Sequence, residues 1–297
     1  MAKDPKTIQE QLDLLEDRDM QFRDISNAPH FLSNISYYRL KGYWWEMQED
    51  FEEHIFKEDV FFEDVVDLYN FDRHLRLIVF NAIERIEIAL RTRLIYHMSL
   101  SYGALWYLDK QHFQSEYHFY KFIDKINNDV DESSEEFIKK HFENHPEEEP
   151  ESWKALEVIT LNTLSKLFYN IKSQYPEKSK ITNEFGLNSS RDLASWFTTI
   201  THIRNIIAHH GRLWNRVMIN YYRWPNNTRA PLLSYYPNDE RRKKIFPIIS
   251  GIIYMNQFIS PGNNLKNELF ELIAQFPNTP LYKMGFPPKW KEEPIWK

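Results

Sequence analysis

Thirteen consecutive residues combine proton-transferring and phosphate-binding side chains with apolar ones: Arg204 to Arg216 reads RNIIAHHGRLWNR. The segment holds three arginines, two adjacent histidines and two asparagines. These residue types suit phosphodiester cleavage, because a neutral imidazole can accept the proton of a ribose 2′-hydroxyl and an imidazolium can protonate the leaving 5′-oxygen. A guanidinium binds the phosphate and stabilises the extra charge of the transition state. Since the 2′-hydroxyl is the nucleophile, such chemistry acts on RNA and requires no metal ion.

Helical geometry would bring these groups together. At about 100° per residue, Asn205 and His209 form an i,i+4 pair on one helix face. Arg204 lies roughly 140° around from His209, but its side chain is long and the helix is close to its end. We therefore predict that Arg204, Asn205 and His209 converge at the C-terminal end of a helix, with His210 as the neighbouring candidate. The negative end of the helix dipole favours a protonated imidazole there, which suits an acid better than a base.

The spacing alone is a weak signal, because arginine precedes histidine at a similar distance at Arg23–His30 and at Arg91–His97. Only the segment that starts at residue 204 adds an asparagine, a second histidine and an arginine-rich continuation. Two alternatives stay open: a histidine pair that caps a helix, and arginines held by internal carboxylates. Zinc is disfavoured, because adjacent helical residues point about 100° apart whereas helical metal ligands are spaced at i,i+3 or i,i+4. We expect no metal and no cofactor.

Composition favours a globular chain built from helices. Of the 297 residues 42% are apolar, enough for a sizeable core, and only 7 are glycine, fewer than turn-rich β folds require. The absence of cysteine excludes disulfides, thiol catalysis and cysteine-ligated metals. No run of about 18 apolar residues and no leader-like apolar segment occurs. We expect a cytoplasmic protein without a membrane partner.

Charge is unevenly distributed along the chain. The net charge is −6, yet residues 200–244 contain nine Lys and Arg against two acids. A local positive field beside an acidic body can concentrate a polyanion at one place. The alternative is that these basic side chains merely solvate a surface.

Hydrophobic periodicity predicts an all-α fold. The clearest signal covers residues 65–99, where apolar side chains recur every three or four positions. Residues 6–18, 152–172 and 245–276 are also expected to be helical. The acidic span 129–151 is expected to be a mobile loop or a partly frayed helix.

The helix that carries the motif has start and stop signals of its own. Ser189 or Ser190 is the expected N-cap, and Asp192 lies in the first turn. Gly211 is expected to end this helix, as Gly103 is expected to end the one over 65–99.

The motif RNIIAHHGRLWNR resembles the signature of the Abi-like abortive-infection proteins of bacteria, of the AbiD and AbiF type. Three upstream segments extend the resemblance: ISYYRLKGYWW at 35–45, the helix at 68–97, and SWKALEVITLNTLSKLFYNIK at 152–172. The likeness covers roughly residues 10–225, in order.

The resemblance implies an activity and a site. These proteins are grouped with the HEPN superfamily, many members of which are metal-independent ribonucleases that use an arginine, a polar residue and a histidine at this spacing. On this chain those positions are Arg204, Asn205 and His209, with His210 adjacent. Endoribonuclease activity in phage defence, as a toxin that leaves 2′,3′-cyclic phosphate ends, is the implied function. The implied partners are RNA, a second copy in a homodimer whose two motifs share one cleft, and an antitoxin that is a protein or an RNA.

The implied architecture is a HEPN-like helical bundle with helical extensions at both ends. We expect an N-terminal helical and aromatic extension over residues 1–60 and a catalytic helical domain over 61–225. A C-terminal helical tail over 226–297 would pack on the same body.

Side chains near the motif could contact RNA beside the cleavage position. We predict such contacts for Arg212, Asn215, Arg216 and Arg91, although an ion network between helices is the alternative for Arg91. The aromatic residues of 35–45 could stack on bases, but packing onto the helical core is the stronger expectation. A rival function is a non-catalytic RNA-binding protein that forms a ribonucleoprotein with a regulatory RNA, and a third is a pure protein-interaction role.

Overall fold

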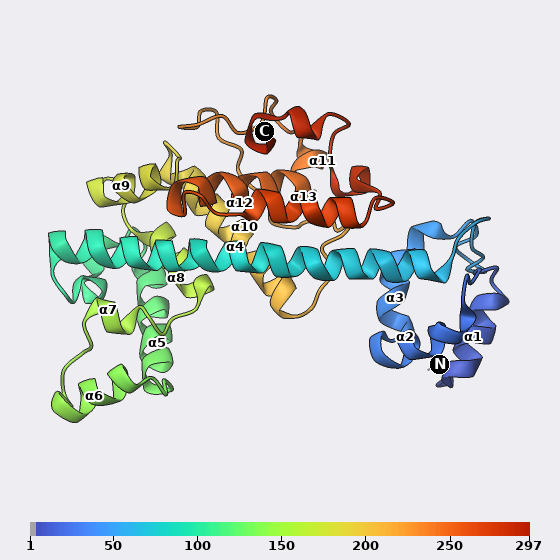
Figure 1. The fold of residues 1–297 in the computed structure, drawn as a ribbon. Coiled ribbons are helices and arrows are strands. Elements are labelled where there is room, and N and C mark those ends of the chain that lie inside the picture. Colours follow the sequence, from blue (N-terminus) through green and yellow to red (C-terminus); the bar gives the residue numbers. More distant parts are fainter. Residues whose placement is uncertain (1–3) are drawn as a thin grey trace. The chain divides into compact units, whose positions relative to one another are not determined.

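The computed structural model describes residues 4–297, and they form helices joined by turns (Figure 1). The α-helices are α1 Ile8–Glu16, α2 Ala28–Ile35, α3 Tyr37–Trp44, α4 Phe62–Tyr102, α5 Glu116–Asp131, α6 Glu136–Asn144, α7 Ser152–Ala155, α8 Leu161–Asn170, α9 Pro176–Glu184, α10 Ser190–Ala208, α11 Asp239–Arg242, α12 Ile245–Ile259 and α13 Leu265–Gln275. Within the described range, β-structure is confined to isolated bridges such as that between Phe113 and Ile171. The prediction of an all-α fold is confirmed.

Two compact units divide the chain. The first comprises residues 4–77 with 268–280, and the second comprises 78–267 with 281–297. Helix α4 contributes residues to both units, and so does the tail after residue 226. None of the helices in residues 4–297 combines the length and the apolar character needed to span a bilayer.

A buried polar network holds the first unit together and accounts for part of the aromatic motif at 35–45. The Tyr43 hydroxyl donates to Asp72 Oδ2 at 2.7 Å, and the same carboxylate forms an ion pair with Arg76. All three side chains are buried. Because a charge inside a protein is costly unless it is matched, the three groups depend on one another. Tyr43 therefore joins α3 to α4 at Asp72 and Arg76.

Helix α4 is long because one apolar stripe continues along it. Five residues spaced at multiples of about 3.5 positions are almost completely buried: Leu75, Val79, Ile86, Leu90 and Leu94. Gly103, with φ of +87°, follows the last helical residue as predicted. The prediction of a helix over 65–99 is confirmed, and the helix extends slightly beyond both ends.

Aromatic packing holds α10 in the core of the second unit. Phe197 meets Phe168 of α8 edge to face, with 5.4 Å between ring centres. Trp196 stacks on Tyr222 at 4.4 Å. The Tyr222 ring in turn lies so close to Gly251 of α12 that a Cβ there would overlap it. Helix α10 is thus held by large rigid rings, which gives its C-terminal end a defined position.

The prediction that residues 152–172 form a single helix is wrong, because the structure has α7, then a break, and then α8. Thr160 begins α8 as its N-cap, with its hydroxyl accepting a backbone N–H. In the break, Arg91 Nε donates to the carbonyl of Leu156 at 2.8 Å, and its Nη2 donates to that of Ile159 at 2.9 Å. A side chain of α4 therefore satisfies carbonyls that a continuous helix would have bonded itself.

Of the two alternatives predicted for 129–151, the loop is wrong, because this span contains the end of α5 and all of α6, and a partly helical segment is what the structure has. Ile138 and His141 lie three residues apart on α6 and are buried. His141 Nε2 lies 2.9 Å from the carbonyl oxygen of Glu148. Two buried side chains on one face outweigh the repulsion of the surrounding acids.

Candidate functional site

The candidate site lies at the C-terminal end of α10, and local hydrogen bonds determine how the chain leaves that helix. At the other end Ser189 is the N-cap and its side chain accepts from the Asp192 N–H, as predicted. The last helical residue is Ala208, whereas the sequence predicted that the helix ends at Gly211, three positions later. His209 is the C-cap, and its N–H donates to the carbonyl of Asn205 at 3.1 Å. The i,i+4 relation of Asn205 and His209 is therefore present in the backbone.

Two further bonds complete the turn after α10. The His210 N–H donates to the Ile207 carbonyl at 2.9 Å, and the Gly211 N–H donates to the Ile206 carbonyl at 2.7 Å. This pair of bonds is the Schellman motif, in which the residue after the cap is left-handed and is usually glycine. Here that residue is His210, with φ of +55°. Gly211 is needed one position later, because a Cβ there would lie 2.9 Å from an Ile206 methyl group.

Both histidines are exposed at this turn. The His209 backbone has φ of −92° and ψ of 18°, whereas His210 is left-handed. Which of the two serves in proton transfer stays a prediction.

Arg204 borders an open pocket of about 360 Å³ between α10 and α4. The α4 residues that line it are Phe80, Ile83, Glu84, Glu87, Ile88 and Arg91. Arg204 is half-buried, and its Nη1 donates a long 3.4 Å hydrogen bond to Asn205 Oδ1. In the part of the chain that the structure describes, no carboxylate forms an ion pair with Arg204. The formal charges of the two arginines and two glutamates cancel, so this pocket is not the strongly positive crevice that the motif suggested.

Arg91 is buried, and its guanidinium is directed at protein groups. Besides the two carbonyls in the α7–α8 break, its Nη2 contacts Glu87 Oε1 at 3.1 Å. Its ion pair with Glu87 lies within α4, and its contacts to the α7–α8 break are hydrogen bonds to backbone carbonyls, so the ion network between helices that was the alternative is present only in part. The RNA contact predicted for Arg91 stays a prediction, and it would compete with these bonds.

The three arginine–histidine repeats of the sequence have different surroundings. Arg23 forms an ion pair with Asp64 at 2.9 Å, and His97 lies 3.0 Å from Glu184. Arg91 is held as just described. Of the three repeats, the one at Arg204 and His209 leaves both side chains without a carboxylate partner within residues 4–297.

The segment after the turn carries the other predicted RNA contacts. The Arg216 Nη1 lies 3.5 Å from the Arg212 carbonyl, and Asn215, at φ of +50°, accepts from Lys244 Nζ at 3.0 Å. The Arg212 guanidinium lies 5.8 Å from the centre of the buried Trp214 ring, and so does Lys283 Nζ. We call Arg212, Arg216, Lys244 and Lys283 the basic cluster.

One member of the basic cluster, Lys283, was missed by sequence reasoning, whereas Lys244 was counted among the basic residues of 200–244. Lys244 and Lys283 are far from the motif in the chain, and folding brings them to it. Lys244 belongs to the run Arg241–Lys244, whereas Lys283 has no such compositional signal. Arg223, a basic residue of 200–244 outside the basic cluster, forms an ion pair with Asp192 at 2.7 Å.

His202 shows that the basic cluster affects its neighbours electrostatically. Burial lowers the pKa of His202 below its usual value of 6.5, and the positive charge of Arg216 lowers it further. This histidine of α10 is therefore biased toward the neutral form.

The aromatic motif at 35–45 divides between core and surface. Tyr43 and Trp44 are buried, and Trp44 packs edge to face on Tyr37 at 5.0 Å. Tyr38 is 84% exposed and Trp45 is 44% exposed. The packing interpretation therefore holds for Tyr43 and Trp44, and stacking on bases stays a prediction for the two exposed rings.

No group of three or more histidine and carboxylate side chains within residues 4–297 has a metal-binding arrangement. Searches of curated proteins and of solved structures find no match to the chain. The model of the family described as Abi-like protein matches residues 30–215, which include α10 and the turn with His209 and His210. This match covers most of the chain, which therefore belongs to the Abi-like protein family.

Proposed function

We propose that the protein is a metal-independent endoribonuclease of the HEPN type that acts in abortive infection, the phage-defence role associated with its family. Arg204 binds the scissile phosphate and stabilises its transition-state charge. His209, or His210 beside it, transfers protons between the ribose 2′-hydroxyl, the leaving 5′-oxygen and solvent. Asn205 orients the phosphate or the imidazole. The products carry 2′,3′-cyclic phosphate ends.

The proposal rests on the surroundings of Arg204 and His209. Both are accessible at the end of one helix, and neither is neutralised by an acid in the described residues. Arg91, by contrast, has the surroundings of a structural arginine, because it bonds two buried carbonyls and a carboxylate. The basic cluster next to the turn supplies positive charge for the flanking phosphates of a strand.

A second copy of the chain belongs to the proposal. Phe80 and Ile88 are exposed apolar side chains beside Glu84, in the pocket that Arg204 lines. Exposed apolar residues that cluster at a candidate site favour a protein contact there. A symmetric contact through this face would bring two copies of Arg204 toward one groove.

Cleavage assays with purified protein, mixed RNA and EDTA test the activity. We expect cleavage in EDTA, and a loss of at least about 100-fold in Arg204→Ala and in His209→Ala, the range of a lost general acid or base. Arg191→Ala, on the first turn of α10, and His145→Ala, after α6, are matched controls at exposed positions and should cleave normally. Cleavage abolished by EDTA, or unchanged in the first two variants, contradicts the proposal.

The same variants distinguish the RNA-binding rival. If the protein only binds RNA, no products form, and His209→Ala keeps its affinity. The log of the affinity would then fall with the log of the salt concentration with a slope of roughly 0.7 per contacted phosphate on single strands.

A further inference from the structure

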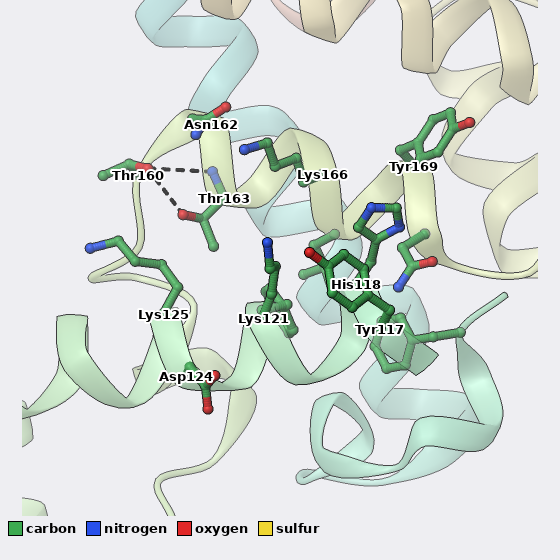
Figure 2. Close-up of a pocket in the computed structure, with 14 residues that line it drawn as sticks. Tyr117, His118, Lys121, Asp124, Lys125, Thr160, Asn162, Thr163, Lys166 and Tyr169 are labelled. Atoms are coloured by element: carbon green, nitrogen blue, oxygen red, sulfur yellow. Dashed lines mark hydrogen bonds between the residues drawn. The ribbon is translucent and has the colours of Figure 1, made fainter. Parts of the chain in front are cut away.

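A second, larger pocket lies between α5 and α8, and none of the predicted site residues lines it. Its volume is about 580 Å³, and it is open on one side. Figure 2 shows side chains from both helices directed into the space between them. The whole pocket lies within the second unit.

The floor of this pocket is apolar and its edge is aromatic. Phe113, Phe122 and Leu167 are buried beneath it. Tyr117 of α5 and Tyr169 of α8 line it with rings that are 63% and 57% exposed. Two exposed tyrosine rings beside an apolar floor offer flat surfaces for a planar ring of a ligand.

The polar lining is predominantly basic. Lys121 and Lys125 extend from α5 toward α8, and Lys166 lies on the α8 side of the same space (Figure 2). Asp124 is the acid among the lining residues. Lys125 is paired with Asp129 at 2.6 Å, outside the pocket lining.

Lys121 and Lys166 are the cations available to a ligand. Within the described chain neither has a carboxylate within ion-pair distance, and Lys121 Nζ lies 4.6 Å from the centre of the Tyr117 ring. Two lysine amino groups without a counter-ion, at the edge of one concave surface, attract an anion.

The start of α8 adds neutral donors to the same space. Thr160, Asn162 and Thr163 line the pocket at the N-terminal end of the helix. Thr160 and Thr163 are hydrogen-bonded to each other, with 3.2 Å between hydroxyl oxygens. The amide of Asn162 and the positive end of the helix dipole therefore complement the lysines.

We propose that this pocket binds a nucleotide, with its base against the tyrosines and the apolar floor and its phosphate between Lys121 and Lys166. The volume suits one ligand of that size, and the lining supplies flat apolar contact and positive charge together. The nucleotide is either a free nucleoside phosphate or one unit of an RNA strand. This inference goes beyond the nuclease proposal and does not depend on it.

Calorimetric titration of the full-length protein at low ionic strength provides the test. AMP, GMP, CMP and UMP are titrated in turn. Adenosine, which lacks the phosphate, and inorganic phosphate, which lacks the base, serve as comparison ligands. We expect at least one nucleoside monophosphate to bind more tightly than adenosine and phosphate do. Equal binding by phosphate alone would overturn the proposal, and so would the absence of binding by every nucleotide and by RNA.

Two kinds of variant locate the binding. Lys121→Gln with Lys166→Gln should weaken nucleotide binding at least about tenfold. Tyr169→Ala should weaken it about fivefold or more while leaving phosphate binding unchanged. The matched control is Lys139→Gln with Lys140→Gln, two exposed lysines of α6 outside the pocket. An equal loss in this control, or none in the pocket variants, would overturn the assignment.

Whether the pocket binds a unit of an RNA strand or a free nucleotide is tested in the Arg204→Ala variant, in which the proposed cleavage is removed. A short oligoribonucleotide is titrated with and without the best monophosphate. If the monophosphate competes, both occupy the pocket. If only the oligoribonucleotide binds, and the Lys121→Gln and Lys166→Gln changes weaken it, the ligand is a unit of RNA. Failure of the nuclease proposal would leave these binding results unaffected.

Discussion

His210 is one of six non-glycine residues with a positive φ in the part of the chain that the structure describes. It occupies the left-handed position of the turn after α10, which glycine adopts freely and which costs another residue about 1 kcal/mol. Backbone strain of this kind is concentrated at functional sites, where the surrounding structure maintains it. A glycine at this position would end α10 at lower cost, so His210→Gly should stabilise the turn slightly.

His202 makes stability depend on pH. Its pKa in the folded protein is lowered by burial and by Arg216, so the unfolded chain binds the proton more readily. Its contribution to stability is therefore fully present above the unfolded pKa of about 6.5, and it is lost as the pH falls through that value toward the folded pKa. We expect the free energy of unfolding to decrease less between pH 7.5 and pH 5 in His202→Gln than in the unchanged protein.

Urea denaturation at several pH values measures this effect. Arg216→Gln should also reduce the pH dependence, because it removes one of the two causes of the lowered pKa. A His202→Gln variant with the same pH dependence as the unchanged protein would contradict the assignment.

At the scale of helices, Gly251 shows how packing overrides helix propensity. It lies inside α12, where alanine would normally stabilise a helix by about 1 kcal/mol relative to glycine. A Cβ at this position would instead overlap the Tyr222 ring, which is stacked on Trp196. We expect Gly251→Ala to destabilise the protein by about 1–3 kcal/mol, measured by chemical denaturation.

A double-mutant cycle isolates the cause. In a Tyr222→Leu background the ring is gone, so the penalty of Gly251→Ala should shrink. An equal penalty in both backgrounds would show that the Tyr222 contact is not responsible.

The helices also show what local pattern can predict. Helices α4 and α10 follow from apolar periodicity and from their caps, because those signals lie within each segment. The break before α8 could not be predicted, since the donor that satisfies its carbonyls, Arg91, lies 65 residues away from Leu156. For the same reason the motif names Arg204 and His209 as candidates but not Lys283, which only the fold brings to Trp214.

At the scale of the whole molecule, the proposed pairing of two copies is the feature to test. Ile88 is 52% exposed in the pocket that Arg204 lines, and Ile88→Glu would place a charge in the proposed contact. Light scattering should give twice the chain mass of 36.1 kDa for the unchanged protein and one chain mass for this variant. RNA cleavage by the Ile88→Glu variant should be lower than that by the unchanged protein.

Leu100→Glu is the matched control for the pairing. Leu100 is also exposed on α4 but lies twelve residues further along, about 18 Å at 1.5 Å per residue. This variant should remain paired. A monomeric and fully active unchanged protein, or equal dissociation of both variants, would rule out the contact.

Arg91 has a consequence for communication within the second unit. Its side chain lines the pocket of Arg204, while its hydrogen bonds hold the carbonyls of Leu156 and Ile159, just before the start of α8. That start lines the pocket between α5 and α8. One guanidinium thus contacts both the first pocket and the segment that precedes the second, so Arg91→Ala should alter both. A small displacement of the Arg91 side chain would then be enough to couple the two pockets, without a large rearrangement of the helices.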